Sequence, residues 1–200
     1  MRKDAELNRE RLIAAAREVF AERGIDAALD AVAKRAGVSI GTLYNRFPTR
    51  NDLVRAAFAD NVDTVARLGE HALGLEDPWD GFVYFVEQVS QLQAADRGYN
   101  ELAARGTPSS EELARGYELM SRIVERAREG GVLRPDFTLE DMAFVTWSIS
   151  RTIEATAGTG TAVWRRHLAL ILDGLRASAA HPLPVPPLSR EELAEIYRSC

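Results

Sequence analysis

Apolar residues recur at spacings of three and four along almost the whole chain, and this regularity limits the folds open to it. Such spacing gathers apolar side chains on one face of an α-helix, whereas a half-buried strand needs strict alternation. Alternating runs of branched residues bounded by turn signals are not found. The sequence therefore predicts an all-α protein, with helices near residues 6–23, 29–36, 39–47, 49–73, 78–95, 98–105, 110–129, 139–156 and 161–178, and a short one after Ser189.

The stretch AGVSIGTLYNRF, residues 36–47, joins two short helices through a tight turn. Gly37 supplies the left-handed backbone that ends the first helix, and Ser39 is a natural N-cap for the second. Pro48 closes the second helix just after Phe47. Two short helices with this connection, held from behind by the helix near 6–23, predict a helix-turn-helix.

The second of these helices has a length that suits DNA. About seven residues span roughly 10 Å, which fits a major groove about 12 Å wide. Leu43 and Phe47 lie four residues apart and are expected to anchor the helix in the core. The first residues should meet base edges, and the later polar and basic ones should meet phosphates. The predicted DNA-binding residues are Ser39, Ile40, Gly41, Thr42, Tyr44, Asn45, Arg46 and Arg50.

The charge distribution agrees with a DNA-binding amino-terminal part. The chain carries a net charge of -5, but residues 1–58 hold eleven basic and eight acidic side chains, while the rest holds 14 basic and 22 acidic ones. A basic module on an acidic body is expected when only one end meets a polyanion. An excess this small also arises by chance.

These motifs resemble the signature of the tetracycline-repressor (TetR) family over about residues 7–58. The similarity lies in Phe20 and Gly24 at the end of the first helix, Val32-Ala33 in the second, Ala36-Gly37-Val38 at the turn, Gly41-Thr42-Leu43-Tyr44 in the third, and Phe47 and Leu53 beyond it. The resemblance implies a dimer with one reading head per subunit. It also implies a helical body that binds a small ligand and controls the spacing of the heads, most often in a repressor.

The chain departs from the family pattern at Ala28, where members usually have Thr or Ser near the start of the second helix. A capping bond is therefore missing there, together with a potential phosphate contact. Asp26 or Asp30 is expected to compensate at the helix start.

The body helices contain more aromatic residues than a plain helical core requires, with polar residues among them. Aromatic side chains at helical spacing are usually core, but buried polar groups need partners, and a ligand can supply them. The predicted effector-binding residues are Phe85, Gln88, Tyr99, Tyr117, Trp147 and Arg151. The alternative for Arg151 is an ion pair with Glu154, three residues along the same helix.

The helix near 161–178 is apolar on more than one face, so both faces must be covered. Trp164, Leu168, Ile171 and Leu175 form one stripe, expected to face the subunit's own core. The second stripe is assigned to a homodimer interface, because Gly174 permits close approach and the family resemblance places the interface there. Its residues are Val163, His167, Leu170 and Gly174.

Other chemistry has little support in the sequence. The only cysteine is Cys200, and His71, His167 and His181 stand far apart, so neither a disulfide nor a metal site is expected. Gly158-Thr159-Gly160 follows a helix and not a strand, which argues against a dinucleotide-binding turn. No cofactor, no catalytic residue and no membrane association are expected, and the expected compartment is the cytoplasm.

The sequence thus predicts a DNA-binding head at residues 1–48, with its helix-turn-helix at about 29–48. A regulatory and dimerisation body follows at 49–180, and a proline-rich appendage with a short helix at 181–200. The predicted partners are a palindromic double-stranded DNA operator, a small-molecule effector and a second copy of the chain. The alternatives are a helical ligand-binding protein without specific DNA binding and, third, an enzyme with scattered catalytic residues.

Overall fold

The structure, a computed structural model, describes residues 2–105 and 111–199. In these ranges it contains α-helices and one short 3-10 helix, with no strand beyond an isolated bridge between Leu133 and Arg176. The elements are α1 (Arg2–Arg23), α2 (Leu29–Ala36), α3 (Ile40–Arg46), α4 (Arg50–Gly74), α5 (Pro78–Ala95), α6 (Arg97–Arg105), α7 (Glu111–Glu129), α8 (Met142–Thr156), α9 (Val163–Leu175), η1 (Ala177–Ala179) and α10 (Arg190–Ser199).

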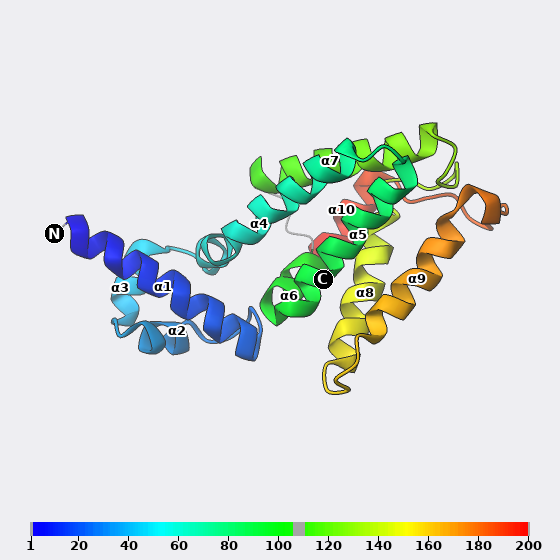
Figure 1. Ribbon diagram of the computed structural model, residues 1–200. Helices are drawn as coiled ribbons and strands as arrows, with labels where there is room; N and C mark the ends of the chain where they lie inside the picture. The colour runs from blue at the N-terminus through cyan, green and yellow to red at the C-terminus, as the bar shows by residue number, and fades with distance from the viewer. Residues whose placement is uncertain (1, 106–110, 200) are drawn as a thin grey trace.

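Figure 1 shows an elongated molecule with α1, α2 and α3 at one end and α5 to α10 at the other, joined by α4. The predicted all-α class is confirmed. In the body, α5 is the central helix and packs against α4, α6, α7, α8 and α9. Helix α7 lies along α4, and α8 pairs with α9.

Two apolar clusters build the interior. The head cluster gathers Leu12, Phe20, Val32, Leu43 and Phe47 from the three head helices, but it does not stop at residue 48. It continues into the first turns of α4 and reaches α6 through Tyr99. The body cluster is centred on Phe82, Phe85, Ile123, Ile149 and Leu168, and half-buried Val65 of α4 touches both clusters.

Capping residues set most helix ends where the sequence indicates them. Thr49 and Asp52 form a reciprocal capping box at the start of α4, and Ser189 and Glu192 bond reciprocally at the start of α10. The Thr138 N–H donates to the Asp141 carboxylate at 2.8 Å, yet α8 begins only at Met142, because residues 139–141 form a turn. The sequence predicts a similar cap from Ser109 and Glu112, and Ser109 falls outside the described residues.

Helix bounds differ from expectation at both ends of the chain. Helix α1 begins at Arg2, one turn before the expected Glu6. Helix α9 ends at Leu175 and not at 178, because the backbone there bonds the segment after α7. The Arg134 N–H donates to the Leu175 carbonyl at 2.9 Å, and the Ala177 N–H donates to the Val132 carbonyl at 2.9 Å.

The tail, which the sequence predicts as an appendage, lies beside the body in the structure. Residues 183–188 run in an extended conformation over the body beside Asp136, Asp141 and Phe144. Leu193 of α10 is buried. The apolar residues between the prolines, Leu183 and Val185, stay exposed and line a groove with Phe144 of the body.

Candidate nucleic-acid interface

Local backbone preferences build the turn between α2 and α3. Gly37 adopts φ 71°, and its N–H bonds the carbonyls at the end of α2. Ser39 then takes an extended conformation, and its hydroxyl accepts a hydrogen bond from the Thr42 N–H at 3.2 Å. A left-handed C-cap followed two residues later by an N-cap turns the chain sharply, so α3 starts in a new direction immediately after α2.

Helix α3 divides into an anchored side and an open side. Leu43 is fully buried and Phe47 is 3% exposed, as the sequence predicts. On the open side, Ile40 is 36% exposed and Tyr44 is 50% exposed. Large apolar and aromatic side chains that stay exposed to solvent on a short helix indicate a surface that binds a partner.

The predicted DNA-binding residues fall into two groups. Ser39, Ile40, Gly41, Tyr44, Asn45 and Arg46 are exposed on α3 or its cap. Half-buried Thr42 lies with them, and its hydroxyl pairs with that of Ser39 at 2.9 Å. Arg50 is different. Its Nη1 donates to the carbonyls of Ile25 and Ala27 at 2.9 and 2.7 Å, so its guanidinium fixes the loop between α1 and α2.

The start of α2 lacks a side-chain cap, as the sequence predicts from Ala28. Neither acidic neighbour supplies one. Asp26 bonds Arg105 of α6 through both carboxylate oxygens, one of them at 3.0 Å from Nη1. This hydrogen bond lowers the pKa of Asp26 below its ordinary value. Asp30 lies inside the first turn of α2, where its negative charge interacts favourably with the helix dipole.

The loop after α1 is also tied to α6 by a bond that the sequence does not reveal. Gly24 turns the chain at φ 84°, and the Ile25 N–H donates to the Glu101 carboxylate at 2.9 Å. Arg97 holds the other carboxylate oxygen at 2.9 Å. A side chain on Gly24 would overlap the Glu101 carboxylate, so the glycine leaves room for this contact. Residues 24–26 are thereby fastened to the body.

The predicted effector residues do not gather around one cavity. Phe85 is buried in the body cluster, whereas Tyr99 belongs to the head cluster, with its ring 6.1 Å from that of Phe58. Arg151 is exposed and pairs with Glu154 at 2.6 Å, which is the alternative that the spacing allowed. Helical periodicity predicts a buried face but not which helix covers it, so these residues point to different neighbours.

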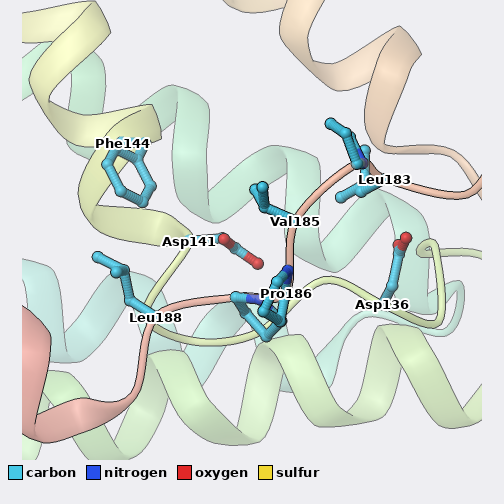
Figure 2. Close-up of a pocket in the computed structure, with 9 residues that line it drawn as sticks. Asp136, Asp141, Phe144, Leu183, Val185, Pro186 and Leu188 are labelled. Carbon is cyan, nitrogen blue, oxygen red and sulfur yellow. The ribbon is translucent and has the colours of Figure 1, made fainter.

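The remaining three residues of that set are Gln88, Tyr117 and Trp147. Gln88 is half-buried on α5. The Trp147 Nε1–H donates to the Ala104 carbonyl at 2.7 Å, and the hydroxyl of exposed Tyr117 donates to Glu140 at 3.3 Å. A shallow groove of about 260 Å³ lies nearby, where residues 183–188 pass Asp136, Asp141 and Phe144 (Figure 2). None of the six predicted residues lines it.

Sequence reasoning missed the polar residues that are buried inside the body. The Asn100 amide donates to the Ser150 carbonyl at 3.2 Å, and the Ser150 hydroxyl donates to the Asn100 carbonyl at 3.4 Å. The Asn100 side-chain oxygen is buried without a partner among the described residues. No local signal separates such residues from the exposed polar residues of the same helices.

The outer face of α9 carries the residues assigned to a dimer. Leu170 is 61% exposed and Val163 is 39% exposed, Gly174 faces open space, and His167 is half-buried. On the inner face, Trp164 and Leu168 are buried as predicted, while Ile171 and Leu175 are only half-buried. Leu172, which belongs to neither predicted stripe, is also buried.

Within residues 2–105 and 111–199, no three His, Cys, Asp or Glu residues are placed to hold a metal ion. No helix in that part of the chain combines the length and the apolar content needed to cross a membrane.

A capped two-helix turn on a supporting helix, with the open side of the second helix facing outward, defines a helix-turn-helix DNA-binding protein. Residues 12–57 match the family described as bacterial regulatory proteins, tetR family, and residues 77–177 match the C-terminal domain of SbtR-like transcriptional regulators. The chain belongs to the TetR family and is a sequence-specific DNA-binding transcriptional regulator.

Individual relatives extend over nearly the whole chain. The transcriptional regulator UidR of Escherichia coli K12 is 26% identical over 193 residues, which cover 88% of this chain and 96% of that protein. The crystal structure of TetR regulator SCO0520 from Streptomyces coelicolor is similar with a TM-score of 0.51 and 29% identity, covering 84% of this chain and 98% of that one. FadR from Bacillus subtilis, solved with stearoyl-CoA, shares the fold at a TM-score of 0.63 and 19% identity, with 86% and 99% covered.

Proposed function

We propose that the chain is a cytoplasmic repressor that binds a palindromic operator as a homodimer and is released from it by a small molecule. In this proposal residues 1–48 read DNA, residues 49–180 bind effector and partner, and no residue has a catalytic role. The observation that carries the proposal is the pair of contacts from α6 to the head, Glu101 with Ile25 and Arg105 with Asp26. Through them a change in the body can reach the helices that read DNA.

The reading surface is proposed to divide its work along α3. Arg46 and Tyr44, near the end of the helix, contact phosphates, and Thr42, near its start, contacts a base. Arg46→Ala should weaken binding to all sequences similarly and lower the salt slope by about 0.9 per contact, nearly 2 for a dimer. Thr42→Ala should instead change the preference at one position in each half-site.

A gel shift with the DNA that flanks the chain's own coding sequence tests this reading head. A discrete complex is expected, with half-sites roughly 34 Å apart. If the salt dependence of binding has the same slope in Arg46→Ala as in the unaltered chain, Arg46 does not contact a phosphate. Arg50→Ala serves as a contrast, because loss of its bonds to Ile25 and Ala27 should lower the melting temperature as well as the affinity.

The homodimer is proposed to form through the outer face of α9. An exposed leucine and valine beside an open glycine allow the helices of two copies to approach closely and bury apolar surface. Leu170→Arg should produce monomers in sedimentation and abolish cooperative operator binding. Leu7→Arg is the matched control for sedimentation alone, since Leu7 is similarly exposed at 46% but lies on α1, in the head. A Leu170→Arg variant that sediments as a dimer would refute the assignment.

The effector is proposed to act by preferring one arrangement of the heads. FadR, a neighbour in fold, was solved with stearoyl-CoA, so this fold can hold an organic ligand. A typical coupling of 1 to 3 kcal/mol would change operator affinity by roughly 5- to 150-fold. By reciprocity, bound DNA must lower the affinity of the chain for the ligand by the same factor. Compounds that raise the melting temperature are then tested for release of DNA.

The coupling contact can be tested apart from ligand binding. Glu101→Gln keeps the side-chain shape but replaces the charged acceptor of the Ile25 N–H, so the effector response should shrink while effector affinity stays near normal. Glu125→Gln on the exposed side of α7 is the control. An unchanged response in Glu101→Gln would place the coupling elsewhere.

A further inference from the structure

The end of the chain lies across the body as a strap, defined here as residues 181–199. Arg134 Nη2 donates to the His181 carbonyl at 2.9 Å, where the strap begins. The extended part, residues 183–188, then forms one wall of the groove beside Asp136, Asp141 and Phe144 (Figure 2). Helix α10 follows and comes to lie by α8.

Side chains hold α10 in place. The Arg190 guanidinium lies over the Tyr117 ring at 5.3 Å, and the Tyr197 ring meets Trp147 edge to face at 5.5 Å. Leu193, between them on the same face of the helix, is 8% exposed. The backbone of α10 does not pack extensively against any other described helix. A few side chains therefore carry most of the attachment.

The surface under α10 has a defined chemistry. The Trp147 ring also meets the ring of Phe144, edge to face at 5.4 Å, and the Tyr117 hydroxyl donates to the Glu140 carboxylate at 3.3 Å. One end of this surface accepts an aromatic ring, and the other offers an aromatic face beside a carboxylate. The strap places the Tyr197 ring at the first end and the Arg190 guanidinium at the second. These two residues lie roughly 10 Å apart along α10.

We propose that the surface formed by Tyr117, Glu140, Phe144 and Trp147 is a binding site for aromatic cations, and that the strap is its built-in competitor. A small molecule with a planar ring and a positive charge reproduces what Tyr197 and Arg190 provide. An aromatic anion gains the ring contact alone and is repelled by Glu140. The link from this site to DNA release rests on the proposed effector response, whereas the binding site does not.

The strap can leave without unfolding the body. Prolines at 182, 184, 186 and 187 keep the connection from η1 to α10 extended, with no helical hydrogen bonds to break. A displaced α10 remains tethered and can return, so it lowers the apparent affinity of any ligand for the surface below. If α10 is docked about nine-tenths of the time, the apparent Kd is raised about tenfold.

Two dyes of opposite charge test the proposal on the full chain without DNA: rhodamine 6G, an aromatic cation, and 1-anilinonaphthalene-8-sulfonate, an aromatic anion. The double variant Leu193→Ala, Tyr197→Ala removes two anchors of the strap. It should bind rhodamine 6G about tenfold more tightly than the unaltered chain does. Adding Glu140→Gln to the double variant should then weaken rhodamine 6G but not the anionic dye, because only the cation uses that carboxylate. Glu191→Ala, on the exposed side of α10, is the matched control and should leave both affinities unchanged.

Adding Trp147→Ala to the double variant should remove the gain for rhodamine 6G. Circular dichroism and melting show whether each variant keeps its fold. An unchanged rhodamine 6G affinity in the folded double variant would overturn the competitor role, and a Glu140→Gln change that weakens neither dye, or both equally, would overturn the cation site. Because no DNA is present, neither result depends on the repressor assignment, which the gel shift tests separately.

Discussion

The head and the body are both helical and each has an apolar cluster, yet they build their working surfaces differently. The proposed reading surface of the head comes from consecutive residues, Ser39 to Arg46, on one capped helix. The aromatic surface of the body combines Tyr117 of α7 with Trp147 of α8, and Tyr197 of α10 covers part of it. A site on one short helix is fixed by local backbone preferences, whereas a site shared by distant helices depends on how they pack.

This difference teaches where each part can be altered. Exposed residues of α3 can change the DNA sequence that is read without disturbing the packing, because Leu43 and Phe47 alone anchor the helix from below. In the body, a residue that meets a ligand also meets a neighbouring helix. The junction between the two parts, where α6 joins the head cluster, is the place to test whether they are independent units.

The largest expected effect concerns Tyr99, the body residue inside the head cluster. Burial raises the pKa of its hydroxyl to about 12, from an ordinary value near 10. The unfolded chain ionises first, so this stability is fully present below pH 10 and is lost as the pH rises to about 12. The loss is roughly 3 kcal/mol.

Tyr99→Phe cannot ionise at this position and should escape that loss. The difference between its free energy of unfolding and that of the unaltered chain, from denaturant titrations between pH 9 and pH 12, isolates this one hydroxyl from the other tyrosines. If the free energies of unfolding of the two proteins fall in parallel over this pH range, water reaches Tyr99 in the folded state. The head and the body would then pack less tightly than the structure indicates.

An intermediate effect is expected at Gly98, where α6 touches the head. A methyl group there would lie 2.8 Å from the Phe58 ring and 3.0 Å from Phe20. Gly98→Ala should lower the free energy of unfolding by about 1 to 3 kcal/mol through overpacking. Gly116→Ala, in α7 with open space around it, should be neutral or stabilising by up to about 1 kcal/mol. If both variants have the same melting temperature, the contact between α6 and the head accommodates an added methyl group without loss of stability.

The smallest expected effect tests the head alone. Ala28→Ser should add the N-cap that α2 lacks and raise stability by about 1 kcal/mol. Thr49→Ala should lose a similar amount, because it breaks the capping box of α4. An unchanged melting temperature in Ala28→Ser would show that the free N–H groups at the start of α2 gain nothing from a side-chain cap.

Sequence patterns were sufficient for the head because its signals are local. The Gly37 turn, the Ser39 cap, the Leu43 and Phe47 anchors and the box at Thr49 all depend on neighbours within a few residues. The bonds of Arg50 to two backbone carbonyls were not foreseen, since a guanidinium near such a helix has the same appearance in sequence whether it faces phosphate or a carbonyl.

The body and the tail could be predicted only as helices and faces. Nothing near Tyr99 indicates that α6 brings it to Phe58, 41 residues earlier in the chain. The spacing of Leu193 and Tyr197 predicts an amphipathic helix but not its resting place on Trp147. Partners of this kind are set by tertiary packing, which a single sequence does not encode in any short window.

Helix α4 belongs to both clusters, and its length turns it into a lever. Twenty-five residues make a rod of about 37 Å. Tilting such a rod by roughly 10° about its far end moves the near end by about 6 Å, half the width of a major groove. In a dimer the two displacements add or cancel according to their directions. A rearrangement of the body by a few degrees would therefore be enough to carry a pair of reading heads out of step with the turn of the double helix.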